Sequence, residues 1–139
     1  MNQEKIQVLV NYRLTESQIA SLNEISDRLD IAYFPKTKFN DIPQDVLKKA
    51  EVLLVSRTIP EAEKVPNLRW IQYTMAGFGS ISESALLARE GFRVTSLSGA
   101  NAPIVAEFSV AAMLAAGHQF HAVRDDQGIR NGQRTIGIV

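Results

Sequence analysis

The sequence predicts an α/β domain with a five-stranded, flavodoxin-like parallel sheet. Short apolar or alternating runs, which are typical of strands, recur between segments that have helical spacing or turn residues. Their order, β-α-β-α-β-β-α-β, is typical of a parallel sheet covered by helices. Right-handed crossovers leave few topologies for that order, and the flavodoxin-like one is the simplest. The 139 residues are enough for one domain with a real core.

The first two predicted strands enclose a helix with a clear start signal. Ile6–Val10 is an apolar run, which indicates a buried strand. Thr15 opens a T-E-S-Q capping box, in which Gln18 reaches back to the cap. The second strand is predicted from Ile31 to Phe34. The apolar side of the helix is predicted from four residues at helical spacing, namely Ile19, Leu22, Ile25 and Leu29.

The next segment adds a helix and a central strand. Pro43 is predicted as the first residue of a helix that runs to Ala50. Val52–Val55 contains no polar residue, so we expect it in the middle of the sheet. Residues 60–65 are predicted to form a loop or one helical turn.

The stretch LRWIQYTMAGFGSI, residues 68–81, is the candidate functional segment. Residues 69–74 alternate between two faces and indicate the fourth strand, which ends in a small loop with Gly77 and Gly79. Glycine permits φ > 0 and lets another molecule approach the backbone N–H groups closely. An open α/β sheet binds its ligand at loops of this kind. The alternative interpretation is an ordinary turn into the next helix.

The last pieces of the sheet follow that loop. A helix is predicted from about Ser82 to Arg89, and Gly91 is suited to follow its end. The fifth strand is predicted from Phe92 to Leu97.

A second region begins after the fifth strand. A helix from Pro103 to at least Ala116 is apolar on nearly every side, so we expect a second domain or subunit to cover it. Residues 128–133 are predicted to form a linker, and residues 135–139 are expected to start a strand that no helix in this sequence follows. The predicted divisions are a flavodoxin-like substrate domain at 1–100, an interdomain or dimerisation helix and linker at 101–134, and the first strand of a truncated domain at 135–139.

Composition excludes several classes of function. Fifteen acidic and fifteen basic residues give no net charge, which makes nucleic acid a poor partner. The absence of cysteine excludes disulfides, thiolate metal sites and a Cys nucleophile. The N-terminus lacks the apolar region of a signal peptide, so a cytoplasmic location is expected, and the longest apolar run is too short for a membrane span.

Other candidate residues have structural interpretations. Trp70, Phe78 and Phe108 are predicted to be core or interface residues rather than part of a cofactor site. His118 and His121 lie three apart without an evident third ligand, so no metal site is expected.

Three segments in order carry a family resemblance: LRWIQYTMAGFGSI, ALLAREGFRVTSLSGANAPIVAEFSVAAMLA and TIGIV. Their order and spacing resemble the D-isomer-specific 2-hydroxyacid dehydrogenases, from roughly Leu53 to Val139. The resemblance implies a flavodoxin-like substrate domain, helices that pack across a dimer interface, and a Rossmann domain for NAD or NADP. It also implies a small 2-oxo or 2-hydroxy acid as substrate, and a homodimer formed through the helix from Pro103 to Ala116.

The resemblance assigns a carboxylate-binding role to the loop of residues 75–78. Successive N–H groups in a glycine turn form an anion-binding nest, which supports that role independently. Arg57 lies where some family members reach the substrate or an effector, and an exposed loop arginine is the alternative interpretation. Asn101 is expected to cap the long helix and Glu107 to make a structural pairing. The loop residues whose backbone N–H groups would face the substrate are Met75, Ala76, Gly77 and Phe78.

The chemistry implied by the resemblance needs parts that this sequence lacks. No G-x-G-x-x-G turn occurs in it, and the family's catalytic Arg, Glu and His would follow Val139. We therefore expect no catalytic residue and no cofactor binding in this chain alone. The first hypothesis is part of an oxidoreductase that transfers hydride between NAD(P)H and a 2-oxo acid, inactive by itself. The alternative is a stand-alone module that binds a small carboxylate or forms a homodimer without catalysis.

Overall fold

The computed structural model describes residues 4–118. The chain divides into two compact units, of which the first ends at Ser98 and the second begins at Gly99. Each unit is described by itself.

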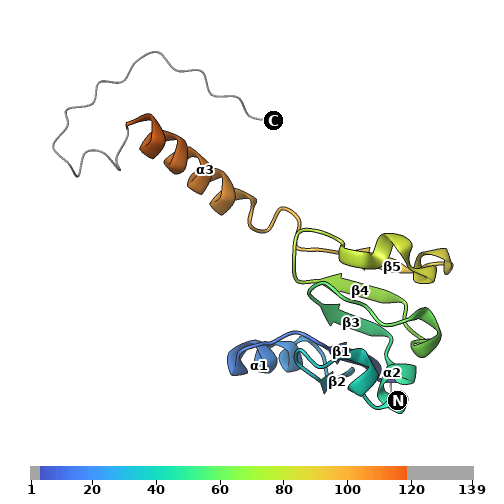
Figure 1. Cartoon of the computed structure of the whole chain (residues 1–139). Coiled ribbons are helices and arrows are strands. Elements are labelled where there is room, and N and C mark those ends of the chain that lie inside the picture. The colour runs from blue at the N-terminus through green and yellow to red at the C-terminus, as the bar shows by residue number, and fades with distance from the viewer. Residues whose placement is uncertain (1–3, 119–139) are drawn as a thin grey trace. The chain divides into compact units, whose positions relative to one another are not determined.

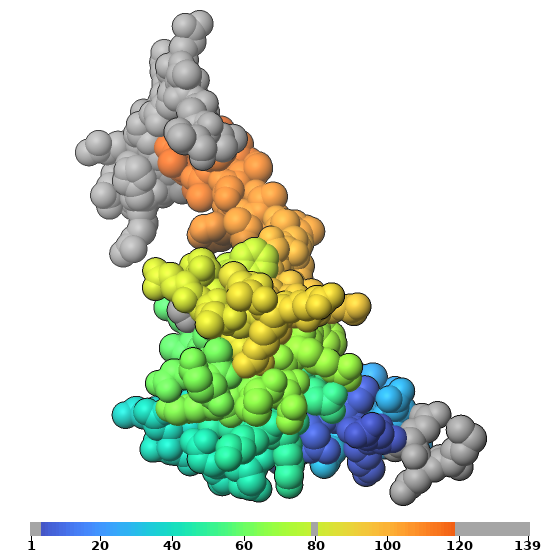
Figure 2. Space-filling model, turned by 90° about the vertical axis from the view of Figure 1, so that its right-hand side faces the viewer, coloured from blue at the N-terminus to red at the C-terminus, as the bar shows by residue number. Residues whose placement is uncertain are grey.

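The first unit is built on a five-stranded parallel sheet, so the predicted fold class is confirmed (Figure 1). All four strand pairs are parallel, and the strand order is β2-β1-β3-β4-β5. As expected from its lack of polar residues, β3 is the central strand. The space-filling view in Figure 2 shows the yellow segment around β5 directly against the light-green segment around β4. The strands are β1 (Ile6–Val10), β2 (Leu29–Tyr33), β3 (Val52–Val55), β4 (Trp70–Tyr73) and β5 (Arg93–Thr95).

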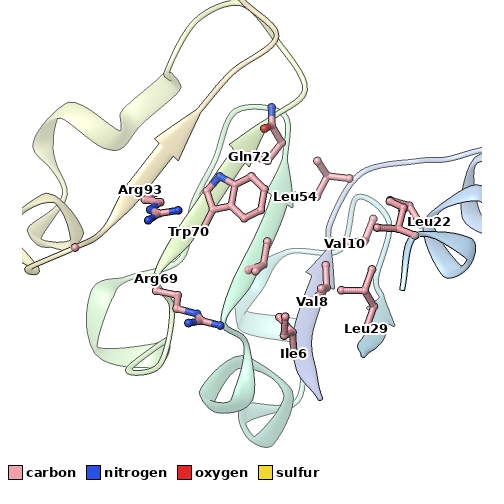
Figure 3. A pocket seen from close by; sticks show the side chains of 13 residues that line it. Ile6, Val8, Val10, Leu22, Leu29, Leu54, Arg69, Trp70, Gln72 and Arg93 are labelled. Carbon is pink, nitrogen blue, oxygen red and sulfur yellow. The ribbon is translucent and has the colours of Figure 1, made fainter. Parts of the chain in front are cut away.

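The two faces of the sheet are covered unequally. Side chains alternate along each strand, so one face carries Leu53 and Ile71 while the other carries Leu54 and Trp70. Leu53 and Ile71 are fully buried, and Leu47 of α2 (Gln44–Lys49) packs into the same cluster. Burying each such side chain stabilises the fold by about 1.5–3 kcal/mol. The opposite face is partly covered by α1 (Glu16–Ile25), whose Leu22 lies near Val10 of β1 and Leu29 of β2 (Figure 3).

The start of α1 was predicted correctly and its end was not. The capping box is confirmed, because the Thr15 hydroxyl accepts from the Gln18 N–H and the Gln18 side chain accepts from the Thr15 N–H. Leu29 was predicted to lie on the helix, but in the structure it begins β2. The helix stops at Ser26, whose backbone is extended and whose carbonyl accepts from the Leu29 N–H. Pro43 is the cap of α2 rather than its first residue.

The expected helix from Ser82 to Arg89 is wrong. The segment forms two 3-10 turns, η3 (Gly79–Glu83) and η4 (Ala85–Ala88). Between them Ser84 has an extended backbone, and its hydroxyl accepts from the Leu86 N–H. Serine competes with helical bonding in this way. Two more such turns are η1 (Phe39–Asp41) and η2 (Ala62–Lys64), and the latter agrees with the predicted single turn.

The second unit contributes α3 (Ala102–Gly117), close to the predicted helix. Asn101 does not cap it as expected, because its backbone is helical and its side chain makes no cap hydrogen bond. The Phe108 side chain is 72% exposed, and Ile104, Val105, Val110 and Leu114 are each more than half exposed. No helix among residues 4–118 is long and apolar enough to cross a bilayer. The predicted linker at 128–133, the strand at 135–139 and His121 lie outside the described residues.

Candidate substrate-binding loop

The candidate loop lies at the carboxyl end of β4 and is tied to both neighbouring strands. Just before it, the Thr74 N–H donates to the Val55 carbonyl at 2.8 Å, which extends the pairing with β3. At its start, the Met75 carbonyl accepts from the Leu97 N–H at 3.1 Å, beyond the end of β5. The loop is therefore fixed at its base, where a parallel sheet presents its ligand-binding edge.

The loop offers backbone donors that have no partner in the described part of the chain. Among residues 4–118, no acceptor bonds the N–H groups of residues 75–78. These residues are exposed, with Met75 at 39% and Phe78 at 52%. Successive free N–H groups carry partial positive charge and can bind an anion. A carboxylate could therefore bind to these N–H groups without breaking any hydrogen bond within the described part of the chain.

Gly77 does not have the positive φ angle for which a glycine was predicted in this loop. Positive φ angles among the described glycines occur at Gly91 and Gly99, whereas Gly77 has none. A Cβ atom placed on Gly77 would meet nothing within 4 Å. The loop therefore does not depend on a left-handed glycine at position 77. An alanine at this position would therefore meet no neighbouring atom.

Arg57 follows the carboxyl end of β3, the strand that pairs with β4. Val55 pairs with Tyr73, and Arg57 and Met75 each lie two residues further along their chains. Arg57 is exposed, and no carboxylate within residues 4–118 forms an ion pair with it. An exposed guanidinium after β3 and free N–H groups after β4 are both groups that bind anions, and they follow strands that end at the same edge of the sheet.

Three polar side chains at this edge were not singled out by the sequence. The hydroxyls of Tyr73, the last residue of β4, and of Thr74, the next residue, are buried, and neither has a hydrogen-bond partner among the described residues. Burial raises the pKa of the Tyr73 phenol above its ordinary value. The Asn11 side chain donates to the carbonyls of Phe34 and Thr37, both at 2.8 Å. Its position directly after an apolar strand was the available signal.

The described residues provide binding groups rather than reacting groups. No cluster of three metal-binding side chains occurs among residues 4–118. A pyrophosphate cradle is not formed either, because Gly77 and Gly79 lead into the short turn η3 rather than an α-helix. Of the two roles predicted for the aromatic residues, core or interface, the core role is wrong, because Trp70 is 38% exposed and Phe78 and Phe108 are more than half exposed. The interface role stays a prediction.

Two solved enzyme structures have a fold similar to that of this chain. D-Lactate dehydrogenase from Aquifex aeolicus, solved in complex with NAD and lactic acid, matches 85% of this chain with a TM-score of 0.61 and 20% identity. A phosphoglycerate oxidoreductase from Rhizobium etli matches 87% with a TM-score of 0.58 and 16% identity. No family model and no curated protein matches the sequence. The fold of this chain is thus similar to part of each of these two enzymes.

The family resemblance seen in the sequence is confirmed at the level of the fold. The chain spans 35% of the length of the first of these enzymes and 40% of the second. What either whole enzyme binds is a property of that enzyme.

Proposed function

We propose that this chain is the substrate-side part of an oxidoreductase that moves hydride between NAD(P)H and a 2-oxo or D-2-hydroxy acid. The free N–H groups of residues 75–78 bind the carboxylate, and Arg57 adds a positive charge beside them. The observation that carries the proposal is the row of unpartnered donors at the carboxyl end of β4, in a fold shared with two oxidoreductases.

The chain alone binds the substrate and does not turn it over. Hydride chemistry belongs to the nicotinamide, and the described residues form no cradle for a dinucleotide. A carboxylate held by N–H groups gains charge-assisted hydrogen bonds, each of about 1.5–3 kcal/mol. Binding without an enclosing wall on an exposed loop is expected to be weak, with a Kd of roughly millimolar.

The proposal is tested by titrating the ¹⁵N-labelled chain with D-lactate and with glyoxylate. We expect shifts concentrated at the amide signals of residues 75–78, and no such shifts with lactamide, in which a neutral amide replaces the carboxylate. Gly77→Pro removes one N–H donor and is expected to weaken binding about tenfold or more. Gly77→Ala retains the donor, and its new Cβ meets nothing within 4 Å, so it serves as the matched control.

Two other measurements test the expected inactivity of the chain and the role of Arg57. The purified chain is expected not to oxidise NADH in the presence of glyoxylate or hydroxypyruvate, and turnover would contradict its inactivity. Arg57→Gln is expected to weaken D-lactate binding severalfold, with a smaller effect at 1 M salt because exposed charges are screened. Equal loop shifts with lactamide and lactate would contradict the carboxylate assignment.

A further inference from the structure

A polar pocket lies at the amino-terminal edge of the sheet, opposite the edge that carries the loop of residues 75–78. It has a volume of about 720 Å³ and lies where β1, β2, β3 and β4 begin, beside the end of α2. The lining carries an excess of two positive charges among residues 4–118. Its charged side chains are four basic and two acidic ones, namely Lys5, Arg28, Lys49, Arg69, Glu4 and Glu51.

One of the two acidic side chains is already compensated by its own partners. The Glu51 carboxylate accepts from the Gln7 N–H at 3.2 Å through one oxygen and pairs with Arg69 at 2.8 Å through the other. The charges of Glu51 and Arg69 therefore offset one another. Glu4 is exposed and forms no ion pair within residues 4–118, so it is the remaining negative group of the lining.

The other three cations of the lining have no ion-pair partner. Lys5, Arg28 and Lys49 are exposed, and none of them pairs with a carboxylate in the described part of the chain. Arg28 comes directly before β2 and Lys49 ends α2, so cations from different elements line one pocket. A phosphate can accept from a guanidinium and an ammonium at once, and such charge-assisted bonds are about twice as strong as neutral ones.

Hydrogen bonds between distant residues hold the backbone around the pocket. The Ile6 N–H donates to the Arg28 carbonyl at 2.8 Å, which fixes the start of β2 beside β1. The Asn67 side chain donates to the Lys48 carbonyl at 2.7 Å, which ties the end of α2 to the segment before β4. That bond also satisfies a carbonyl at the negative end of α2, where a free carbonyl would disfavour an anion. The backbone of the pocket is thus organised before a ligand binds.

We propose that this pocket binds a small phosphate monoester, whose phosphate group contacts Arg28 and Lys49. A phosphate dianion matches the two excess charges of the lining, whereas a monocarboxylate carries one charge. The volume lies within the range of small-molecule sites, about 300–1,000 Å³, which leaves room for an organic group beside the phosphate. The pocket and the loop of residues 75–78 lie at opposite edges of the sheet, so this inference is independent of the proposed function.

The site is tested by titrating the ¹⁵N-labelled full chain with glycerol 3-phosphate and with inorganic phosphate, at constant pH and ionic strength. We expect both to cause saturable shifts at the amide signals of residues 6–7, 28 and 49–51, with a Kd of roughly millimolar. Acetate, a monoanion, should bind at these residues at least severalfold more weakly. The Tm should rise with the concentration of glycerol 3-phosphate, because the ligand binds the folded chain and not the unfolded one.

Charge removal within the pocket provides the decisive variants. Arg28→Gln and Lys49→Gln are each expected to weaken binding of glycerol 3-phosphate about tenfold, since each removes a charge-assisted bond. Both side chains are exposed, so both variants should fold. Lys38→Gln, at an exposed site outside the pocket, removes the same charge and should leave the Kd unchanged.

The outcomes separate this proposal from the proposed function. Gly77→Pro, which removes a donor from the loop of residues 75–78, should leave the shifts at the pocket unchanged. A lack of saturable shifts at residues 6–7, 28 and 49–51 would overturn the proposal, as would equal weakening by Lys38→Gln or equal affinity for acetate. Binding of inorganic phosphate without binding of glycerol 3-phosphate would overturn the assignment to a monoester.

Discussion

Tyr73 is an unusual core residue because its polar end is buried without a partner. The side chain is fully buried, and no described residue bonds its hydroxyl. A buried polar group left unsatisfied costs about 1–3 kcal/mol. Burial also raises the pKa of this phenol, because the charged form is poorly solvated there.

Tyr73→Phe is therefore expected to leave the free energy of unfolding at pH 7 unchanged or to raise it by about 1 kcal/mol. The wild-type chain should lose stability as the pH rises above about 10, the ordinary tyrosine value, because the folded state retains a proton that the unfolded state releases. Urea unfolding between pH 8 and pH 11 measures both effects. The variant should show a shallower loss above pH 10, and Tyr12→Phe, at a more exposed tyrosine, is the matched control. An identical alkaline slope in Tyr73→Phe would contradict the argument.

At the level of single residues, the sequence could locate the candidate loop but not its donors. Alternation through residues 69–74 followed by small residues was sufficient to predict the strand end and the loop. Whether the N–H groups of residues 75–78 are bonded depends on neighbouring strands, which one sequence does not place. For the same reason, the sequence did not reveal that Gly77 has an ordinary φ or that the Thr74 hydroxyl is buried.

At the level of elements, one arginine joins two irregular segments. Arg89, after η4, donates from Nη2 to the Ala62 carbonyl at 2.7 Å and from Nη1 to the Val65 carbonyl at 2.8 Å. A third bond reaches the Leu68 carbonyl at 3.1 Å. Val65 and Leu68 are buried, so the guanidinium satisfies carbonyls in the segment that leads into β4.

Arg89→Met keeps the aliphatic stem and removes every one of these donors. We expect it to lower the free energy of unfolding by about 2–4 kcal/mol, since bonds from a charged donor to carbonyls are lost together. Arg28→Met, at an exposed arginine, should change it by less than about 0.5 kcal/mol. Chemical denaturation of the two variants provides the comparison. Equal stability of the two variants would show that the hydrogen bonds of Arg89 do not stabilise the fold.

Element prediction succeeded where the signal was local. The capping box at Thr15 involves residues three apart, and the structure forms it as predicted. The segment from Ser82 to Arg89 has helical spacing, but the Ser84 hydroxyl bonds locally and Arg89 bonds to distant carbonyls. Those interactions favour two short turns over one helix. A tertiary partner such as Ala62, twenty-seven residues away, cannot be predicted from helical periodicity.

At the level of the whole molecule, the second unit presents an apolar helix, α3. Ile104, Phe108 and Leu114 are each more than half exposed, and Glu107 is the only charged residue between Ala102 and Gly117. Monomeric proteins rarely expose continuous apolar surfaces of this size. We propose that α3 forms the contact of a homodimer, as the family resemblance implies.

Sedimentation velocity at micromolar concentration tests this assembly. The wild-type chain is expected to sediment as a dimer, and Phe108→Glu as a monomer, because a charge would be buried in an apolar contact. Lys48→Glu in α2 leaves α3 unchanged and should remain dimeric. A clean wild-type monomer would contradict the proposal.

The order of the strands also determines when the fold can assemble during synthesis. β1 pairs with β2 on one side and with β3 on the other, and β3 begins only at Val52. A nascent chain that has released α1 and β2 therefore holds β1 with one edge unpaired until β3 leaves the ribosome. During that interval the edge of Val8, Leu9 and Val10 is open to incorrect strand pairing. Pauses in translation just before Val52 should thus lower the yield of folded protein more than pauses after Tyr73.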